Sequence, residues 1–248
     1  MRILAIDIGT GTQDILLFDS DRAIENSVQM VMPSPTVIAR DRVRTATAER
    51  LPVVLTGVNM GGGPVTGAVR EHVEAGLAVY AISSAAVTFD DDPNEVRAMG
   101  VEIISEEEAN GVKHGVTVDL KDLDLAMVRQ SLAAFVVAGD WDALAVAVFD
   151  HGDAPPGYSD RKFRFDHLRQ QVLGGKRDPV SFVYLADEVP DYLTRMRAVI
   201  DVALRDEPGT PLLMMDTAEA AILGSLEDPR VAVEQRKVVA NLGNEHTL

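Results

Sequence analysis

The sequence predicts an α/β fold built on a largely parallel mixed sheet. Short apolar runs alternate with longer stretches of helical composition along nearly all of the 248 residues. Apolar residues make up 46% of the chain, which is enough for a buried core and argues against a disordered chain. Strands that alternate with helices usually pair in parallel, because each helix returns the chain to the same end of the sheet.

We expect strands where apolar runs are bounded by turn residues, and helices between them on both faces of the sheet. The expected strands are residues 2–6, 14–18, 27–32, 52–55, 78–82, 144–149, 181–185, 212–215 and 237–240. The expected helices are residues 36–50, 65–75, 123–136, 166–172, 191–204 and 217–226. The first two strands are joined by a glycine turn and form an N-terminal β-hairpin. Asp122 or Asp124 is expected to cap the helix that follows them in the sequence.

Charge and composition exclude several classes of function. The chain has 39 acidic and 23 basic side chains, for a net charge of −16, whereas binding to a nucleic acid polymer needs a basic surface. A single nucleotide is still compatible, because a local nest of N–H groups is enough to hold its phosphates. The chain has no cysteine, which excludes disulfides, thiolate zinc sites, iron–sulfur clusters and cysteine nucleophiles within it.

No segment predicts a membrane or an export signal. The first charged side chain after the opening apolar run is Asp7, too early for a signal peptide. The longest apolar runs, such as residues 144–149, are far shorter than the ~20 residues of a membrane helix. We therefore expect a cytoplasmic protein with no membrane partner.

The most informative segment is the glycine turn between the first two strands. Gly9 and Gly11 fit the start of a dinucleotide-binding fingerprint, but Asp14 stands where its third glycine belongs, and a strand follows instead of a helix. An aspartyl-phosphate phosphatase would need a second aspartate at Gly9. Two alternatives are left: a plain hairpin, or a hairpin whose backbone N–H groups hold a phosphate.

In the phosphate alternative, the glycines allow the close approach of the anion and polar side chains add donors. Asp7 at the end of the first strand would hold a hydrated Mg²⁺ that bridges the phosphates. The residues that would bind phosphate are Gly9, Thr10, Gly11, Thr12 and Gln13.

Three further positions are candidates for a site. Residues 61–63 are three consecutive glycines before a helix, which suits either an anion site at the helix N-terminus or a tight turn with Pro64 in the first helical turn. Asp150 follows a buried strand and could act as a general base, or belong to a polar loop with His151. Asp216 also ends a strand and is a second candidate for the base, or the N-cap of the next helix.

The segment Ile6-Asp7-Ile8-Gly9-Thr10-Gly11-Thr12 resembles the first phosphate motif of the actin-like ATPase superfamily, which includes sugar kinases, heat-shock chaperones and actin. Residues 238–248 resemble the second phosphate motif, although that motif usually has an aspartate where Asn241 stands. The resemblance implies an actin-like, ribonuclease-H-like domain that binds ATP with Mg²⁺. It also assigns Asn241, Gly243 and Asn244 to the phosphates.

More narrowly, the chain resembles a prokaryotic family within this superfamily whose members are often labelled pyruvate formate-lyase activating enzymes. This resemblance rests on the N-terminal hairpin and on residues 56–64, 215–217 and 241–247. The label itself does not fit the sequence, because a radical activase holds its [4Fe–4S] cluster through cysteines.

The resemblance also implies how the chain is divided. Residues 1–236 would form the N-terminal α/β domain, with room for inserted elements, and residues 237–248 the first strand and turn of a second, truncated domain. We therefore expect ATP hydrolysis or phosphoryl transfer to a small molecule, with weak or absent nucleotide binding by this chain alone. The alternatives are a non-catalytic interaction or sensor domain, and a metal-dependent phosphohydrolase in which Asp7, Asp150 and Asp216 converge. The oligomeric state is not predicted.

Overall fold

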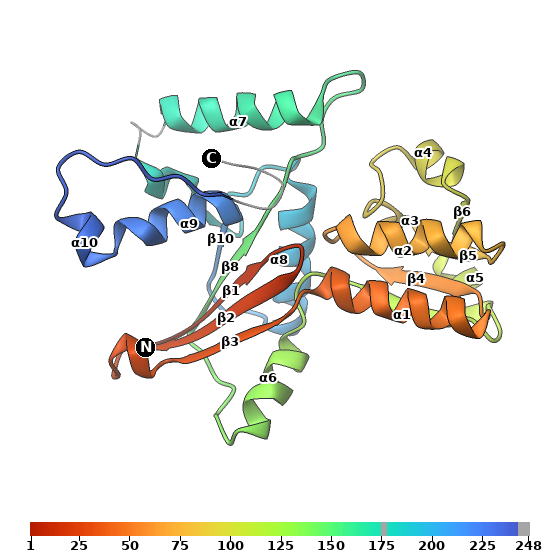
Figure 1. Ribbon diagram of the computed structural model, residues 1–248, viewed down its shortest axis with the longest axis horizontal. Helices are drawn as coiled ribbons and strands as arrows, with labels where there is room; N and C mark the ends of the chain where they lie inside the picture. The colour runs from red at the N-terminus through yellow and green to blue at the C-terminus, as the bar shows by residue number, and fades with distance from the viewer. Residues whose placement is uncertain (175–177, 243–248) are drawn as a thin grey trace.

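The computed structural model describes residues 1–174 and 178–242, and shows two β-sheets with a separate hydrophobic core for each (Figure 1). Sheet A is built from the N-terminal strands and from the second half of the chain. We call sheet A with the helices that pack on it the first unit, and sheet B with its helices the second unit. The strands of sheet B all lie within residues 53–120. The second unit is therefore inserted in the sequence between β3 (Val28–Pro33) and α6 (Leu125–Ala134). The α/β fold class is therefore confirmed, with one sheet more than the sequence predicted.

Sheet A is mixed, in the order β3-β2-β1-β8-β10-β9. Its strands are β1 (Arg2–Ile8), β2 (Thr12–Asp19), β3 (Val28–Pro33), β8 (Ala143–Val148), β9 (Tyr184–Leu185) and β10 (Leu212–Met215). The predicted N-terminal hairpin is present: β1 pairs antiparallel with β2, and β2 with β3. On its other side β1 pairs parallel with β8, which pairs parallel with β10. The strand ends of β1, β8 and β10 therefore meet at one edge.

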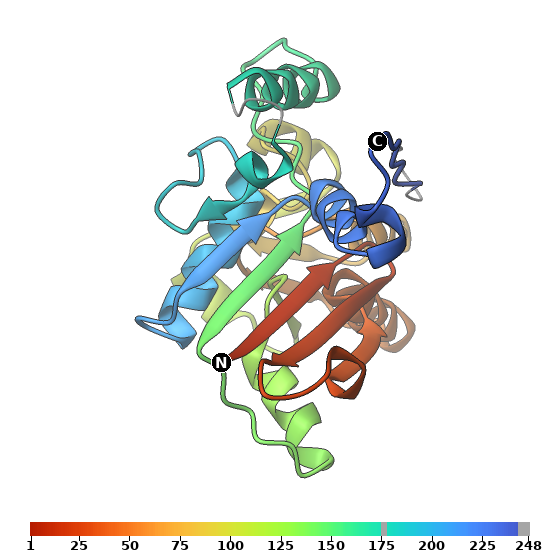
Figure 2. The ribbon, with the colours of Figure 1, turned by 90° about the vertical axis from the view of Figure 1, so that its left-hand side faces the viewer.

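The two faces of sheet A are covered unequally. Alternation along β1 turns Leu4, Ile6 and Ile8 to one face, where they pack with α6 (Leu125–Ala134) and α8 (Thr194–Asp206). On the opposite, outer face, α9 (Thr217–Leu226) covers the strands only near one of their ends, as Figure 2 shows. An open groove of about 510 Å³ remains on this outer face.

Sheet B is fully parallel, in the order β6-β5-β4-β7. Its strands are β4 (Val53–Gly57), β5 (Val79–Ile82), β6 (Val101–Ile104) and β7 (Val116–Leu120). The helices around it are α1 (Pro35–Glu49), α2 (Gly63–Glu74), α3 (Ser83–Ala86), α4 (Pro93–Ala98) and α5 (Glu106–Gly111). Its core consists mostly of Val and Ala, and the strands are short and buried, as is usual for parallel sheets.

Three sequence predictions are corrected by the structure. Sheet A is not largely parallel, because three of its five strand pairs are antiparallel. Residues 181–185 were expected to form a strand, but Asp178 caps a 3₁₀ turn, η2 (Pro179–Phe182), and only β9 follows it. Residues 237–240 form no strand: they pair with no neighbour, and Val238 is 97% exposed.

The remaining elements lie at the periphery. Helix α7 (Asp160–Gly174) starts earlier than expected, because its polar first turn gives no apolar periodicity, and it stands apart from the sheets in Figure 1. The short elements are η1 (Ile24–Asn26) and α10 (Pro229–Ala232). Within the described residues, every helix is too short or too polar to span a lipid bilayer.

Candidate functional site

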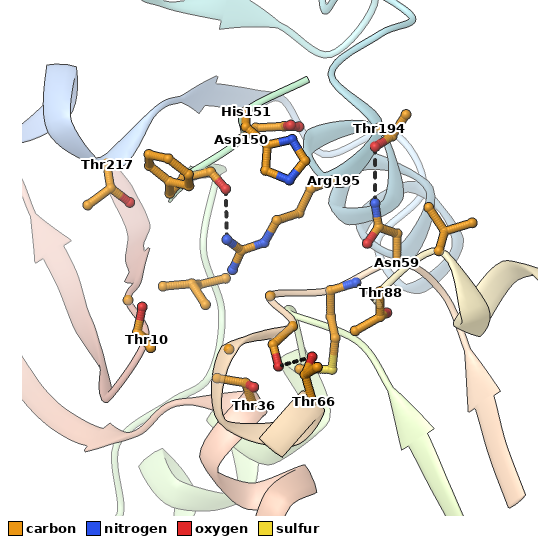
Figure 3. Close-up of a pocket in the computed structure, with 18 of the residues that line it drawn as sticks. Thr10, Thr36, Asn59, Thr66, Thr88, Asp150, His151, Thr194, Arg195 and Thr217 are labelled. Carbon is orange, nitrogen blue, oxygen red and sulfur yellow. Dashed lines mark hydrogen bonds between the residues drawn. The ribbon is translucent and has the colours of Figure 1, made fainter. Parts of the chain in front are cut away.

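A cavity of about 460 Å³ lies between the two sheets, where the carboxyl ends of β1, β8 and β4 meet (Figure 3). Its walls come from both units and include eight threonine and asparagine residues that supply neutral polar groups. These are Thr10, Thr36, Asn59, Thr66, Thr88, Thr194, Thr217 and Asn241. Parallel strands commonly place ligands at their carboxyl ends, so this cavity is the candidate site.

The hairpin turn between β1 and β2 forms one wall. The N–H of Gly9 donates to the carbonyl of Thr12 (2.9 Å), and Ser34 fixes the turn by donating its hydroxyl to the carbonyl of Thr10 (2.8 Å) and its N–H to that of Gly11 (3.1 Å). Gly9 and Thr10 line the cavity, whereas Gly11 and Thr12 do not. Only half of the predicted phosphate-binding turn therefore faces the site.

Gln13 was also predicted to bind phosphate, and its side chain faces elsewhere. It is buried on the inner face of β2 and donates its Nε2 to the carbonyl of Pro33 (3.0 Å). Alternation along a strand explains this, because each side chain of a strand faces only one side of the sheet. Gln13 thus stabilises the junction between β2 and β3.

The glycine run 61–63 forms the facing wall, and a side chain at any of the three glycines would make a close contact. A Cβ at Gly61 would lie 2.6 Å from Nη2 of Arg195, and a Cβ at Gly62 would lie 2.4 Å from the carbonyl oxygen of Thr88. A Cβ at Gly63 would lie 3.2 Å from the methyl group of Thr10. The glycines therefore allow the start of α2 to lie against the hairpin turn, although Gly63 and Thr10 are 53 positions apart in the sequence.

These two walls present open backbone donors. Within the described residues, the N–H groups of Thr10, Gly62 and Gly63 have no hydrogen-bond acceptor. All three residues line the cavity. Pro64 has no N–H, and the N–H of Val65 donates to the hydroxyl of Thr36 (3.3 Å), so the open donors are concentrated at the glycines. Convergent N–H groups of this kind form a nest for an anion.

A buried ion pair forms the floor. Arg195 in α8 donates Nε to Oδ2 of Asp122 (2.6 Å) and Nη2 to Oδ1 (3.0 Å), and its Nη1 donates to the carbonyl of Phe149 (2.7 Å). The N–H of Gly61 donates to the same carboxylate. Burial lowers the pKa of Arg195, but the charge and hydrogen bonds of Asp122 outweigh it and raise that pKa.

Sequence reasoning did not find this pair. Asp122 was considered only as a helix cap, and the structure gives that role to Asp124, which accepts from the N–H of Met127 (2.9 Å). Arg195 carries no local motif. A pair of residues 73 positions apart gives no periodic or spacing signal in one sequence.

Asp150 lines the cavity, yet both of its carboxylate oxygens accept backbone hydrogen bonds. Oδ1 accepts from the N–H of Gly152 (2.9 Å) and Oδ2 from that of Met196 (2.9 Å). Burial raises the pKa of Asp150, and these N–H bonds partly oppose the increase. The carboxylate can still accept further hydrogen bonds, because each oxygen has two lone pairs.

Asp216 lies directly behind Asp150 and is not part of the cavity wall. It is the N-cap of α9, accepting from the N–H of Ala218 (3.1 Å), and it accepts from the N–H of Asp150 (3.1 Å). Arg164 in α7 donates to both of its oxygens (2.7 and 3.1 Å). Burial raises the pKa of Asp216, but the bonds from Arg164 outweigh it, and the net pKa is lowered. The structure therefore realises the N-cap alternative.

Asp7, the predicted metal ligand, faces the outer groove of sheet A instead of the cavity. Its Oδ1 accepts from the hydroxyl of Thr217 (2.7 Å), which does line the cavity. Burial raises the pKa of Asp7. In residues 1–174 and 178–242, no three histidine, aspartate or glutamate side chains gather closely enough to hold a metal ion.

The rim of the cavity is acidic. Asp91, from the loop after α3, and His151, from the loop after β8, both line it. Burial and the neighbouring Asp153 raise the pKa of Asp91 to about 6, while His151 opposes the increase. The imidazole Nδ1 of His151 lies 2.9 Å from the carbonyl of Gly152. Asp91 can therefore change charge near pH 6.

The far end of the chain reaches the same cavity. Asn241 is one of its lining residues, together with Gly9 and Thr10, which lie more than 230 positions earlier in the sequence. Gly243 and Asn244, also predicted to bind phosphate, lie outside the described residues. The first and second motifs predicted from the sequence therefore meet at one site through Gly9, Thr10 and Asn241.

Comparison with known proteins gives one family. No curated protein sequence matches the chain. Residues 60–248 match the model of a family described as "Putative pyruvate format-lyase activating enzyme (DUF1786)". The match spans about three quarters of the 248 residues, including the glycine run, both strand-end aspartates and Asn241. The chain therefore belongs to this family.

Proposed function

We propose that the cavity binds the phosphates of ATP, accompanied by Mg²⁺, and that the protein hydrolyses ATP or transfers its γ-phosphoryl group to a small hydroxylated molecule. The observation that carries the proposal is that three separate glycine-rich segments meet in one cavity. Gly9 and Thr10, residues 61–63 and Asn241 come from the start, the middle and the end of the chain. A cavity lined by open N–H donors and threonine hydroxyls suits phosphate oxygens.

The architecture supports an actin-like, ribonuclease-H-like assignment for the first unit. Sheet A begins with an N-terminal hairpin that runs into parallel strands, and its glycine turn opens onto the site. These are the features that the sequence resemblance implies. Sheet B is then the inserted element that supplies the second wall.

The chain's own residues have distinct roles in this proposal. Thr10, Gly62 and Gly63 hold phosphate oxygens through their N–H groups, and Asp150 accepts the proton of the attacking water or hydroxyl. The new bond joins that oxygen to the γ-phosphorus as the bond to the ADP oxygen breaks. Asp216 positions Asp150 through the 3.1 Å bond to its N–H. Mg²⁺ would be held mainly by phosphates and water, and it neutralises their charge when bound.

A non-catalytic nucleotide-binding or sensor domain is the second candidate. Both oxygens of Asp150 are already occupied by backbone N–H groups, and Asn241 stands where the resembled motif has an aspartate. Binding without turnover would fit these two observations. A metal-dependent phosphohydrolase has less support, because Asp7, Asp150 and Asp216 do not share a metal-binding cluster. We do not propose the activase activity in the family description, since the chain has no cysteine.

Titration with ATP and Mg²⁺ tests the proposal. We expect binding weaker than about 1 µM, measured by calorimetry at high protein concentration. Thr10→Val removes a hydroxyl at the cavity wall and should weaken binding about tenfold, because hydrogen bonds to charged groups are strong. Thr12→Val is the matched control, since Thr12 belongs to the same turn but lies outside the cavity.

The outcomes separate the candidates. Binding with turnover that Asp150→Asn abolishes supports the enzyme, and binding without turnover supports the sensor domain. No binding of ATP at millimolar concentration, or equal losses in Thr10→Val and Thr12→Val, would contradict the phosphate site.

A further inference from the structure

The four outer edges of the two sheets differ in how well they are protected against pairing with another strand. β9 has two residues, β6 has four and includes the exposed Glu102, and β7 includes Asp119 in an ion pair with Lys121. Short length and charged side chains are the usual means of blocking an edge. β3 has neither: it has six residues, Val28–Pro33, and no charged side chain.

β3 is also apolar and exposed. Val31 is 66% exposed and Met32 is 39% exposed, and no strand of the described residues pairs with the outer edge of β3. Met30 and Val31 also line the open groove on the outer face of sheet A. The chain has a net charge of −16, so most of its surface repels a second acidic molecule. Another molecule can pack against the uncharged β3 without bringing acidic side chains together.

We propose that two copies of this chain pair through their β3 edges, antiparallel and about a twofold axis. An antiparallel edge can pair with itself in this way, and twofold dimers are the commonest closed assemblies. The resulting sheet would run continuously through both copies. The proposal does not depend on the function of the cavity, because β3 contributes no residue to it.

The alternation of side chains restricts the register. Val28, Met30 and Met32 pair with the inner-face residues of β2, whereas Gln29 and Val31 pair with its outer-face residues. Residues directly opposite each other in an antiparallel pair have their side chains on the same face of the sheet. The twofold axis must therefore lie between the two copies of one residue, and not between two neighbouring positions of the strand. An axis at Met30 places Val28 opposite Met32 of the second copy, and Gln29 opposite Val31. Pro33, which has no N–H, then lies outside the ladder.

Charges at the two ends of β3 fit this arrangement. The segment before β3 contains Glu25 in η1. Beyond the other end of β3, Arg42 in α1 lines a separate groove together with Met32 and Pro33. Within the described residues, neither Glu25 nor Arg42 has an ion-pair partner. Antiparallel pairing brings the acidic end of each β3 to the basic end of the other, so that each of these charges gains a partner of opposite sign.

The oligomeric state of the full chain tests the proposal, measured by sedimentation velocity between about 1 and 100 µM. We expect a species of twice the 26.8 kDa chain mass. Val31→Lys places like charges together near the axis and should weaken the dimer by more than about tenfold. The matched control is Leu185→Lys, at the 49% exposed residue of β9 on the opposite edge of the same sheet, which should leave the dimer intact.

A charge-exchange pair keeps the test independent of any folding defect in Val31→Lys. Glu25→Arg and Arg42→Glu should each weaken the dimer roughly twofold to fivefold, and the double variant should restore it. Circular dichroism confirms that each variant is folded. A monomer at 100 µM, an undiminished Val31→Lys dimer, or equal effects of Val31→Lys and Leu185→Lys would overturn the proposal. A monomer that instead adds a foreign extended peptide to β3 would also overturn it.

Discussion

Two buried arginine–aspartate pairs lie at the base of the site, and they differ in the number of carboxyl groups around the arginine. Arg195 meets one carboxylate, Asp122, in a two-point contact. Arg164 meets Asp216 in a similar contact, but Glu219 lies nearby, with its Oε2 3.9 Å from Nη2 of Arg164. Both arginines also donate to a backbone carbonyl, of Phe149 and Asp150 respectively.

The difference decides which pair responds to pH. The Arg195 pair balances one positive and one negative charge, and the N–H of Gly61 completes the hydrogen bonding of the carboxylate. In the Arg164 cluster one positive charge faces two buried carboxyl groups. Burial, together with the charge of Asp216, raises the pKa of Glu219 to about 8. Glu219 is therefore protonated at neutral pH, and a side-chain hydrogen bond with Asp216 contributes to its raised pKa. The first pair is a fixed structural contact, and the second is titratable.

Removing one member of the fixed pair should have the largest effect on stability. Asp122→Ala leaves the guanidinium of Arg195 buried without its carboxylate, which costs about 3–5 kcal/mol of the free energy of unfolding. Urea denaturation measures it. Because Gly61 and Phe149 contact the same pair, the proposed binding of ATP should weaken as well.

The control for this variant removes both charges. The double variant Asp122→Leu/Arg195→Met should lose less stability than Asp122→Ala, because neither charge is then left buried and unpaired. A double variant that is as unstable as the sum of the two single variants would show that the pair is not a coupled unit.

Replacing the titratable carboxyl should have the next largest effect, and the effect should depend on pH. The pKa of Glu219 is higher in the folded state than its ordinary value of 4.5, so the folded protein retains a proton that the unfolded chain releases. The stabilisation is therefore complete below about pH 4.5 and is lost as pH rises to about 8. We expect a loss of about 2–3 kcal/mol across this range.

Glu219→Gln replaces the protonated carboxyl with a neutral amide and should remove this component of the pH dependence. Urea denaturation at several pH values compares the variant with the unchanged protein, and the difference isolates Glu219 from Asp91, whose pKa is also raised. Identical pH profiles for the two proteins would show that Glu219 does not hold the proton.

The strands and glycine segments were predictable because their signals are local. The hairpin of β1 and β2 and the strands β4, β5, β8 and β10 each appear as an apolar run with a turn residue at its end. The glycine runs marked two walls of the cavity for the same reason. By contrast, β6 and β7 were missed, because Glu102 in β6 and Thr117 and Asp119 in β7 interrupt their apolar runs.

The polar part of the site was not predictable, because its geometry depends on contacts between distant segments. Asp7, Asp150 and Asp216 all end strands, yet only Asp150 faces the cavity. Whether a strand-end side chain faces the site depends on which face of the sheet it occupies and on which neighbour accepts or donates. The partners of these residues, Thr217, Met196 and Arg164, lie 46 to 210 positions away from them.

The smallest expected effect sharpens the description of the fixed pair. Gly61→Ala places a Cβ 2.6 Å from Nη2 of Arg195, and the guanidinium has to move away from Asp122 to accommodate it. We expect a loss of about 1–2 kcal/mol, as for overpacking in a buried site. Gly67→Ala in α2 is the matched control, since a Cβ there meets nothing within 4 Å and alanine favours a helix, so stability should rise by about 0.5–1 kcal/mol. If both variants were equally stable, the glycine run would owe its presence to the ligand alone and not to the packing against Arg195.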